Sequence, residues 1–307
     1  MQHTNSILTG DVYDRLPDLP DESVHMVMTS PPYWNLRDYG VEGQLGLEET
    51  PEEFVENLAE VFDEVKRVLR PDGSLWLNLG DTYDDKDLQQ IPARVALELQ
   101  DRGWILRNRV TWTKPNPMPH GVSDRLNTTT EPIFHFIKNK EYYYNLEKIR
   151  GELAESTKKK LDGRLDERDK IPSSLGNSNR KDRKGGGGNV DGTLATNPDG
   201  KNPGDVFDIP TEHFSEGHFA VYPPELCEKP IKATCPKDGI VLDPFAGAGT
   251  TCLKAKELGR KFIGIELNPE YADMARARIG LSPHDPSNVR NDDDQSGLEA
   301  YADGGKP

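Results

Sequence analysis

One short run of residues combines a hydroxyl, rigid backbone and aromatic rings. The run Thr29–Trp34 reads Thr-Ser-Pro-Pro-Tyr-Trp, and it follows the apolar segment Val24–Met28 directly. Proline fixes φ and carries no N–H, so the backbone carbonyls near Pro31 and Pro32 are left free to accept hydrogen bonds. Acceptors beside a stacking ring suit a planar substrate with an exocyclic amine. The run therefore predicts a site for a nucleobase at the end of a buried strand.

A second run with chemical potential lies far downstream. Gly239–Thr251 reads Gly-Ile-Val-Leu-Asp-Pro-Phe-Ala-Gly-Ala-Gly-Thr-Thr, which predicts a buried strand, a glycine-rich turn and a helix start. Gly247 and Gly249 permit tight turning and close approach of a ligand, and Thr250 can cap the helix. The next expected strand ends at Glu266, an acid 23 residues after the aspartate of the first strand. This layout is typical of a nucleoside-binding βαβ unit, whose acid binds ribose hydroxyls.

Together the two runs resemble those of amino-methylating DNA methyltransferases that use S-adenosylmethionine. Ser30–Tyr33 is similar to their catalytic motif, and Asp243–Thr250 is similar to their cofactor motif. The catalytic motif comes first, which is the order of the β group of that family. Shorter pieces of the resemblance lie at Gly10-Asp11, Arg67–Gly73, Trp112–Pro119 and His218–Ile231. The resemblance covers residues 1–145 and 215–280.

The resemblance implies roles for individual residues. Ser30 Oγ and the Pro31 carbonyl would accept hydrogen bonds from the target amine, within the motif that Pro32 completes, and Tyr33 would stack on the base. The base must first leave the DNA duplex, because a methyltransferase cannot reach it in the stack. The residues that the resemblance assigns to S-adenosylmethionine are Asp11, Asp243, Pro244, Phe245, Gly247, Gly249, Thr250 and Glu266.

Positive charge is concentrated in one segment of an otherwise acidic chain. The net charge is −15, yet residues 158–184 hold ten basic side chains against five acidic ones. Phosphate neutralisation dominates the affinity of proteins for DNA, so this segment is the favoured DNA-facing element, although a charge run can also be a solvated loop. Trp112 and Lys114 could equally finish a strand. The residues predicted to contact DNA are Trp34, Trp112, Lys114, Lys158, Lys159, Lys160, Arg180 and Lys181.

In the family that the chain resembles, Asp-Pro-Pro-Tyr usually goes with adenine N6 and Ser-Pro-Pro-Tyr with cytosine N4, so the resemblance implies cytosine N4 as the methylated atom, with adenine N6 as the alternative. Carbon-5 methylation needs a cysteine nucleophile, usually in a Pro-Cys context, and Cys227, Cys235 and Cys252 do not provide one. The acidic composition together with the motifs also resembles haloarchaeal methylases that modify CTAG sites. An RNA or protein methyltransferase, and a non-catalytic DNA-binding regulator, remain alternatives.

The bulk composition bounds the setting of the protein. An acidic surface suits a cytoplasm at molar salt, where the Debye length is about 3 Å and repulsion of DNA is weak, so we expect a halophilic protein. No stretch approaches the roughly 20 apolar residues of a membrane span, and the N-terminus lacks the pattern of a signal peptide. Three cysteines without pairing spacing indicate a reducing cytoplasm and no metal site. Expected partners are double-stranded DNA and a cognate restriction endonuclease, with the protein as monomer or homodimer.

Alternating strand and helix patterns predict a Rossmann-like α/β fold with a mostly parallel, seven-stranded sheet. We expect the strand Ile240–Asp243 to lie beside the strand Val24–Met28, so that both motifs reach one crevice at the carboxyl edge. The expected organisation is a catalytic half (1–146), a flexible target-recognition insertion (147–216), a cofactor-binding half (217–280) and an acidic tail (281–307). The other expected strands span residues 6–8, 74–79, 104–112, 132–137 and 261–266, and the expected helices span 51–69, 89–102 and 250–258.

Overall fold

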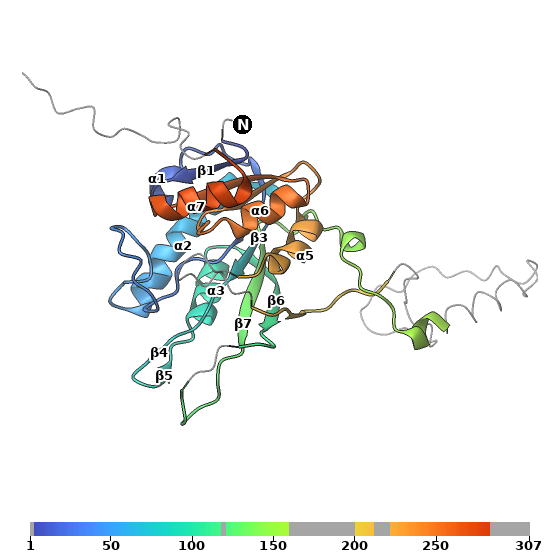
Figure 1. Ribbon diagram of the computed structural model, residues 1–307, viewed down its shortest axis with the longest axis horizontal. Coiled ribbons are helices and arrows are strands. Elements are labelled where there is room, and N and C mark those ends of the chain that lie inside the picture. Colours follow the sequence, from blue (N-terminus) through green and yellow to red (C-terminus); the bar gives the residue numbers. More distant parts are fainter. Residues whose placement is uncertain (1–2, 118–120, 160–199, 212–221, 283–307) are drawn as a thin grey trace, which may run out of the picture.

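A computed structural model describes residues 3–117, 121–159, 200–211 and 222–282 as a sheet with helices on both faces (Figure 1). The sheet has eight strands, and β7 is antiparallel to both of its neighbours while the other pairs are parallel. In order across the sheet the strands are β1 (Ser6–Thr9), β10 (Lys261–Glu266), β9 (Ile240–Asp243), β2 (Val24–Thr29), β3 (Leu69–Asn78), β7 (Thr130–Ile137), β6 (Ile105–Thr113) and β8 (Val206–Asp208).

The helices divide between the two faces of the sheet, each over its own apolar core. The first face is covered by α1 (Val12–Arg15), α2 (Pro51–Val68) and α3 (Ile91–Asp101). The second face is covered by α5 (Pro224–Thr234), α6 (Thr250–Glu257) and α7 (Pro269–Ile279). A short 3-10 helix, η1 (Leu146–Lys148), follows β7, and a small hairpin of β4 (Tyr83–Asp84) and β5 (Asp87–Leu88) projects away from the sheet (Figure 1).

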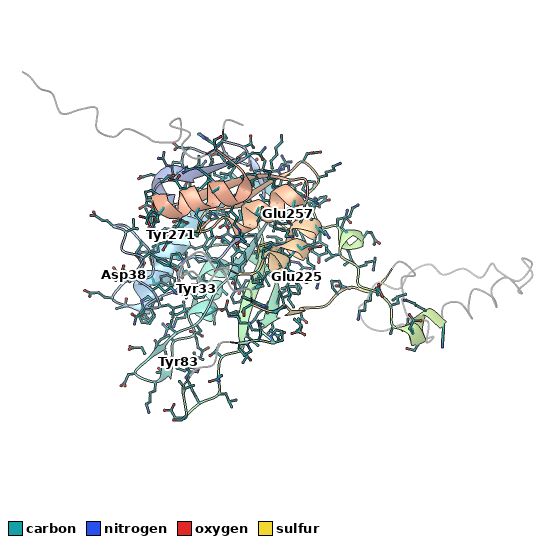
Figure 2. All side chains as sticks on the ribbon, viewed as in Figure 1. Tyr33, Asp38, Tyr83, Glu225, Glu257 and Tyr271 are labelled. Carbon is teal, nitrogen blue, oxygen red and sulfur yellow. The ribbon has the colours of Figure 1, made fainter. Side chains whose placement is uncertain are left out.

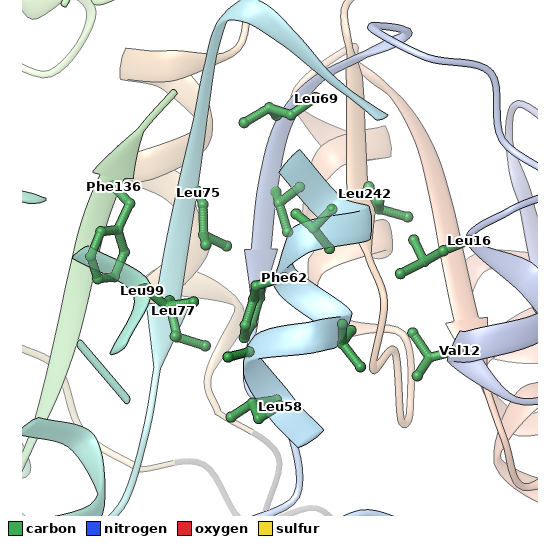
Figure 3. Close-up of a cluster of buried hydrophobic side chains, with 14 of the residues drawn as sticks. Val12, Leu16, Leu58, Phe62, Leu69, Leu75, Leu77, Leu99, Phe136 and Leu242 are labelled. Atoms are coloured by element: carbon green, nitrogen blue, oxygen red, sulfur yellow. The ribbon is translucent and has the colours of Figure 1, made fainter. Parts of the chain in front are cut away.

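The sequence specifies α2 clearly. The Thr50 side chain accepts a hydrogen bond of 3.2 Å from the backbone N–H of Glu53, and Pro51 occupies the first turn, as predicted. Phe54, Leu58 and Phe62 recur on one face and are fully buried. Figure 3 shows Leu58 and Phe62 packed over the sheet beside side chains of β3 and β9. Burial of this apolar stripe is what fixes the helix against the sheet.

Two details of the sheet differ from the sequence prediction. Pro71–Gly73 does not separate α2 from the next strand but lies within β3, where the pairing with β2 shifts between Val24 and Met26. The eighth strand, β8, falls in the region expected to be a flexible insertion and pairs in parallel with β6. It was missed because it is three residues long and has one buried side chain, Phe207.

The two motif-bearing strands are neighbours, as predicted. β2 pairs in parallel with β9, with Met26 opposite Val241 and Val27 opposite Leu242. The carboxyl ends of these strands therefore lie together at one edge of the sheet. The same edge receives the end of β3, the end of β6 and, because β7 runs the other way, the beginning of β7. Among the described residues no helix is long and apolar enough to cross a membrane.

Candidate active site

A buried hydrogen bond joins the two motifs at the carboxyl edge of the sheet. The Thr29 hydroxyl, at the end of β2, donates to Asp243 Oδ1, at the end of β9, over 2.7 Å. The same carboxylate oxygen accepts the backbone N–H of Phe245 over 3.2 Å. Thr29 and Asp243 are both fully buried. The contact joins the strand end that leads into Ser30–Tyr33 to the strand end that leads into the Gly247–Thr250 turn.

The Tyr33 hydroxyl is the centre of a polar cluster. Ser30 Oγ lies 3.1 Å from it, Glu131 Oε2 lies 3.0 Å from it and Asn78 Oδ1 lies 3.3 Å from it. The Tyr33 ring packs so closely on Gly80 that a Cβ on that residue would lie 2.2 Å from the ring. Figure 2 shows Tyr33 within the body of the described fold, and Tyr83 on the hairpin that projects from it. Burial, and then the negative charge of Glu131, raise the pKa of Tyr33 well above its usual value.

Glu131 also forms an ion pair with Lys114, and both side chains are largely shielded from solvent. Lys114 directly follows β6, while Glu131 lies near the start of the antiparallel strand β7. Sequence reasoning missed Glu131 and Asn78 as site residues. The position of Asn78, a polar residue at the end of a buried parallel strand, could have identified it as a site residue. No such signal exists for Glu131, because the sequence alone does not show that its strand is antiparallel.

Glu266 lies where an acid of a nucleoside-binding unit is expected, at the end of β10. Its carboxylate accepts backbone N–H groups from Gly247 over 2.7 Å and from Asn268 over 2.8 Å. The backbone N–H of Gly10 bonds to the Glu266 carbonyl over 2.9 Å, which brings the following Asp11 to the same edge. Asp11 caps α1 by accepting from Tyr13 N over 3.0 Å.

The turn before α6 corrects one expectation. Gly249, with φ +74°, occupies the N-cap position, and no side chain caps this helix. Thr250 instead lies inside the helix, where its hydroxyl accepts a hydrogen bond of 2.8 Å from Arg278. Gly249 is required because a Cβ there would lie 2.9 Å from Ala275. Close packing of α6 against α7 therefore decides the cap.

Burial dominates the electrostatics of the cofactor side. It raises the pKa of Asp243 from 3.8 to about 6, against the opposing effect of hydrogen bonds led by that from Thr29. Burial also raises the pKa of Glu266, and the nearby charge of Asp243 raises it further. Tyr222 donates to Asp243 Oδ2 over 3.3 Å and also bonds to Thr251, which in turn donates to the Met28 carbonyl over 3.1 Å. Sequence reasoning also missed Tyr222 and Thr251, which tie α5 and α6 to the end of β2.

The residues around Gly247 fit a nucleoside. Apart from the neighbours of Gly247 in the chain, no described residue has an atom within 4 Å of the position that a Gly247 Cβ would take, so the turn faces open space. Glu266 offers carboxylate oxygens with lone pairs beyond those used by the backbone, and ribose hydroxyls are matching donors. Phe245 is partly exposed and packs against the apolar core, which leaves ring surface for a flat ligand. Pro244 is buried behind it.

Two tryptophans expected to face DNA lie in the core instead. Trp34 is 4% exposed and its indole N–H donates to the Glu48 carbonyl over 3.0 Å; Trp112 is 3% exposed and donates to the Ile209 carbonyl over 2.8 Å. Burial of these large apolar rings in the core stabilises the fold more than an exposed position would. Lys114 lies over the Trp112 ring, 4.5 Å from its centre.

The expected basic segment is described only at its start. Lys158 pairs with Glu155 over 2.8 Å and Lys159 is exposed. Lys160, Arg180 and Lys181 lie outside the described residues, as does most of the segment 158–184. The described residues hold no group of three or more His, Cys, Asp or Glu side chains that could bind a metal ion.

Comparison with known proteins identifies the family. A sequence profile described as DNA methylase, of the N6 and N4 amino methyltransferases, matches residues 24–277. The chain belongs to this family. The type II methyltransferase M.XycI of Xanthomonas campestris pv. cyanopsidis is 36% identical over 304 residues, covering 90% of this chain and 87% of its own. M.SfiI of Streptomyces fimbriatus is 33% identical over 376 residues, covering 87% and 89%.

Solved structures described as DNA methylases have a similar fold. The PvuII DNA methyltransferase, described as cytosine-N4-specific, superimposes with a TM-score of 0.65 at 22% identity, over 91% of this chain and 87% of its own. A putative DNA modification methylase from Thermus thermophilus, complexed with S-adenosyl-L-methionine, gives a TM-score of 0.58 at 26% identity, over 90% and 93%. At 22% identity the first match establishes the fold alone.

Proposed function

We propose that this amino DNA methyltransferase methylates the exocyclic N4 amine of cytosine in duplex DNA, with S-adenosylmethionine as the methyl donor. The observation that carries the proposal is the buried bond between Thr29 and Asp243, which joins the residue before Ser30 to the strand end that leads into the glycine turn. The full-length similarity to type II methyltransferases supports DNA as the substrate and a restriction-modification system as the setting.

The residues that fit the donor are those around the glycine turn. Glu266 would accept hydrogen bonds from ribose hydroxyls, Phe245 would provide an apolar surface, and Asp11 lies at the same edge to meet the adenine or its neighbouring atoms. Gly247 leaves the turn open to the ligand. When bound, the donor supplies a methyl group on a sulfonium, which needs an attacking lone pair.

The protein's own residues would prepare that lone pair. The amine of cytosine is conjugated with its ring, so its lone pair is delocalised and it is a poor nucleophile. Hydrogen bonds accepted from its N–H groups favour a pyramidal nitrogen. Ser30, which is partly exposed, and Pro31, which is buried, directly follow β2. Ser30 Oγ and the Pro31 carbonyl would accept these bonds, and the base would enter from the open edge after it leaves the duplex.

The Ser-Pro-Pro-Tyr form of the motif, which in this family usually goes with cytosine N4, supports cytosine N4 over adenine N6, which the family also includes. The acidic composition, with a net charge of −15, further supports function at high salt, and CTAG is the recognition sequence that the haloarchaeal resemblance suggests. Residues 158–184 are proposed to approach the DNA backbone.

Modification-sensitive sequencing of DNA from a methylation-free host that expresses the protein tests the proposal. We expect N4-methylcytosine at one recognition sequence. N6-methyladenine would redirect the proposal to the other amine, and unmodified DNA with an expressed, folded protein would contradict it. Ser30→Ala should abolish the signal. The matched control is Ser23→Ala, which should methylate normally. Ser23 directly precedes the same strand, at its opposite end, and its hydroxyl donates to the Pro20 carbonyl over 2.6 Å.

A further inference from the structure

The hydrogen bonds around Tyr33 form a chain with one direction. Ser30 Oγ lies 3.1 Å from the Tyr33 hydroxyl, which lies 3.0 Å from Oε2 of Glu131. An ionised carboxylate can only accept hydrogen bonds, while a tyrosine hydroxyl has one proton to donate. The proton of Tyr33 therefore points toward Glu131, and the tyrosine oxygen is left to accept from Ser30.

Asn78 imposes the same direction. Its amide nitrogen lies 3.2 Å from the Pro132 carbonyl and 3.2 Å from Glu131 Oε2, and both of those groups are acceptors. The amide nitrogen must therefore be on that side, so Asn78 Oδ1 faces the Tyr33 hydroxyl at 3.3 Å. Each group that Tyr33 meets beyond Ser30 is thus an acceptor, and Tyr33 has to donate to one of them.

The direction matters because Ser30 could otherwise bond to an amine in either sense. A serine hydroxyl that donated to the amine nitrogen would tie up the lone pair that must attack. A serine whose proton is committed to Tyr33 presents only lone pairs to a ligand. Successive hydrogen bonds in a shielded site also polarise one another, so the carboxylate at the end of the chain strengthens the acceptor at its beginning.

We propose that Glu131 is a positioning residue that fixes the direction of the Ser30–Tyr33 hydrogen bond, so that Ser30 accepts from the target amine and does not donate to it. The inference rests on the proposed function and adds a residue to it. Lys114, paired with Glu131 on the neighbouring strand, holds the carboxylate in place. The neutral Ser30 thereby acts only as an acceptor, as a carboxylate would, although the carboxylate of Glu131 is two hydrogen bonds away through Tyr33.

Steady-state kinetics on duplex DNA test the role. Glu131→Gln should lower kcat about 100-fold, as expected when a reacting group is misoriented, with little change in KM for DNA or in donor affinity. Tyr33→Phe should lower kcat as well. In the Tyr33→Phe background the Glu131→Gln change should add less than about threefold, because both variants break the same chain. Glu131→Asp, which retains the charge, should recover part of the loss.

The matched control is Glu228→Gln, which breaks a Glu–Lys pair with Lys232 on α5, and should keep wild-type kcat. A wild-type kcat in Glu131→Gln would overturn the inference. The inference would also be overturned if Glu131→Gln lowered kcat by the same factor in the Tyr33→Phe background as in the wild type, because Glu131 would then act through a group other than Tyr33.

A second measurement does not depend on activity. The phenol of Tyr33, labelled with ¹³C at its ζ carbon, can be titrated by NMR. Removing the charge of Glu131 should lower the pKa of Tyr33, in both Glu131→Gln alone and Glu131→Gln with Lys114→Gln. An unchanged Tyr33 pKa would overturn the inference whatever the enzyme does to DNA. Absence of methylation by the wild type with the expected titration would contradict the proposed function alone.

Discussion

The hydroxyl of Thr29 donates a hydrogen bond of 2.7 Å to the carboxylate of Asp243, across 214 residues of sequence. Neither side chain is exposed to solvent. A buried carboxylate is costly unless it is well bonded, and this one also accepts from the backbone of Phe245 and from Tyr222. The bond makes the ends of the two central strands one rigid unit, which is the geometry that group transfer between two bound ligands needs.

We predict that Asp243→Asn makes the fold less sensitive to pH. The pKa of Asp243 in the folded protein is raised from 3.8 to about 6, so the folded state binds more protons than the unfolded state between these values. Stability due to this group therefore falls as the pH rises through that window, by about 3 kcal/mol in total at 1.36 kcal/mol per pKa unit. Denaturant unfolding of both proteins from pH 4 to pH 7 measures it. A wild type that gains stability over the variant in that range would contradict the prediction.

Gly247→Val should prevent binding of S-adenosylmethionine. Gly247 has φ +51° and faces open space, so valine would strain the backbone and fill the place of the ligand. Gly259→Val is the matched control, because Gly259 has φ +69° and also faces open space, after α6. Both variants should lose about 1–2 kcal/mol of stability from the left-handed backbone. Calorimetric titration should show loss of binding in Gly247→Val only; equal affinities would relocate the cofactor turn.

Gly80→Ala should inactivate the enzyme while the cofactor still binds. A methyl group at this position would lie 2.2 Å from the Tyr33 ring, so the ring must move and the cluster around its hydroxyl must break. We expect a loss of kcat of about 100-fold, the usual scale for a misplaced reacting group. Gly121→Ala is the control, since no described atom lies within 4 Å of its added methyl group. Normal turnover by Gly80→Ala would show that the position of Tyr33 is unimportant.

The basic residues of 158–184 should contribute to DNA affinity through the phosphates. Replacing all ten by glutamine should weaken DNA binding and reduce the slope of log affinity against log salt by about 0.9 for each phosphate that is no longer neutralised. Binding of S-adenosylmethionine should not change. Fluorescence anisotropy over a series of KCl concentrations measures DNA affinity and its salt slope, and calorimetric titration measures binding of the donor. An unaltered salt slope would place the DNA-binding surface elsewhere on the protein.

Local patterns were enough to predict most elements of the fold. The strand Ile240–Asp243 was predicted with the bounds that the structure has, and the start of α2 followed from Thr50 and Pro51. Continuous apolar runs and caps report local preferences, which the tertiary structure left unchanged here. The neighbouring positions of β2 and β9 were also predicted, because two ligand-binding motifs at strand ends have to share one edge of a parallel sheet.

Features set by contacts between distant residues were not predicted. Trp34 was predicted to contact DNA, and Trp112 either to contact DNA or to finish a strand, but both side chains are buried. The cap of α6 is Gly249 rather than Thr250, since α7 packs too closely for a side chain there. A short edge strand such as β8 has too few buried residues to give a pattern of its own.

The sequence by itself determined the chemistry that this protein carries, because each motif is a continuous run whose residue types and spacing suffice to define it. Only the tertiary structure decided which further side chains meet that chemistry. Asn78, Lys114 and Glu131 come from three different strands or their ends. Because β7 runs antiparallel to β3 and β6, Asn78 and Glu131 meet the Tyr33 hydroxyl, and Lys114 pairs with Glu131. The pairing of strands, which no local pattern encodes, therefore brought the carboxylate of Glu131 to Tyr33, whose hydroxyl bonds to Ser30.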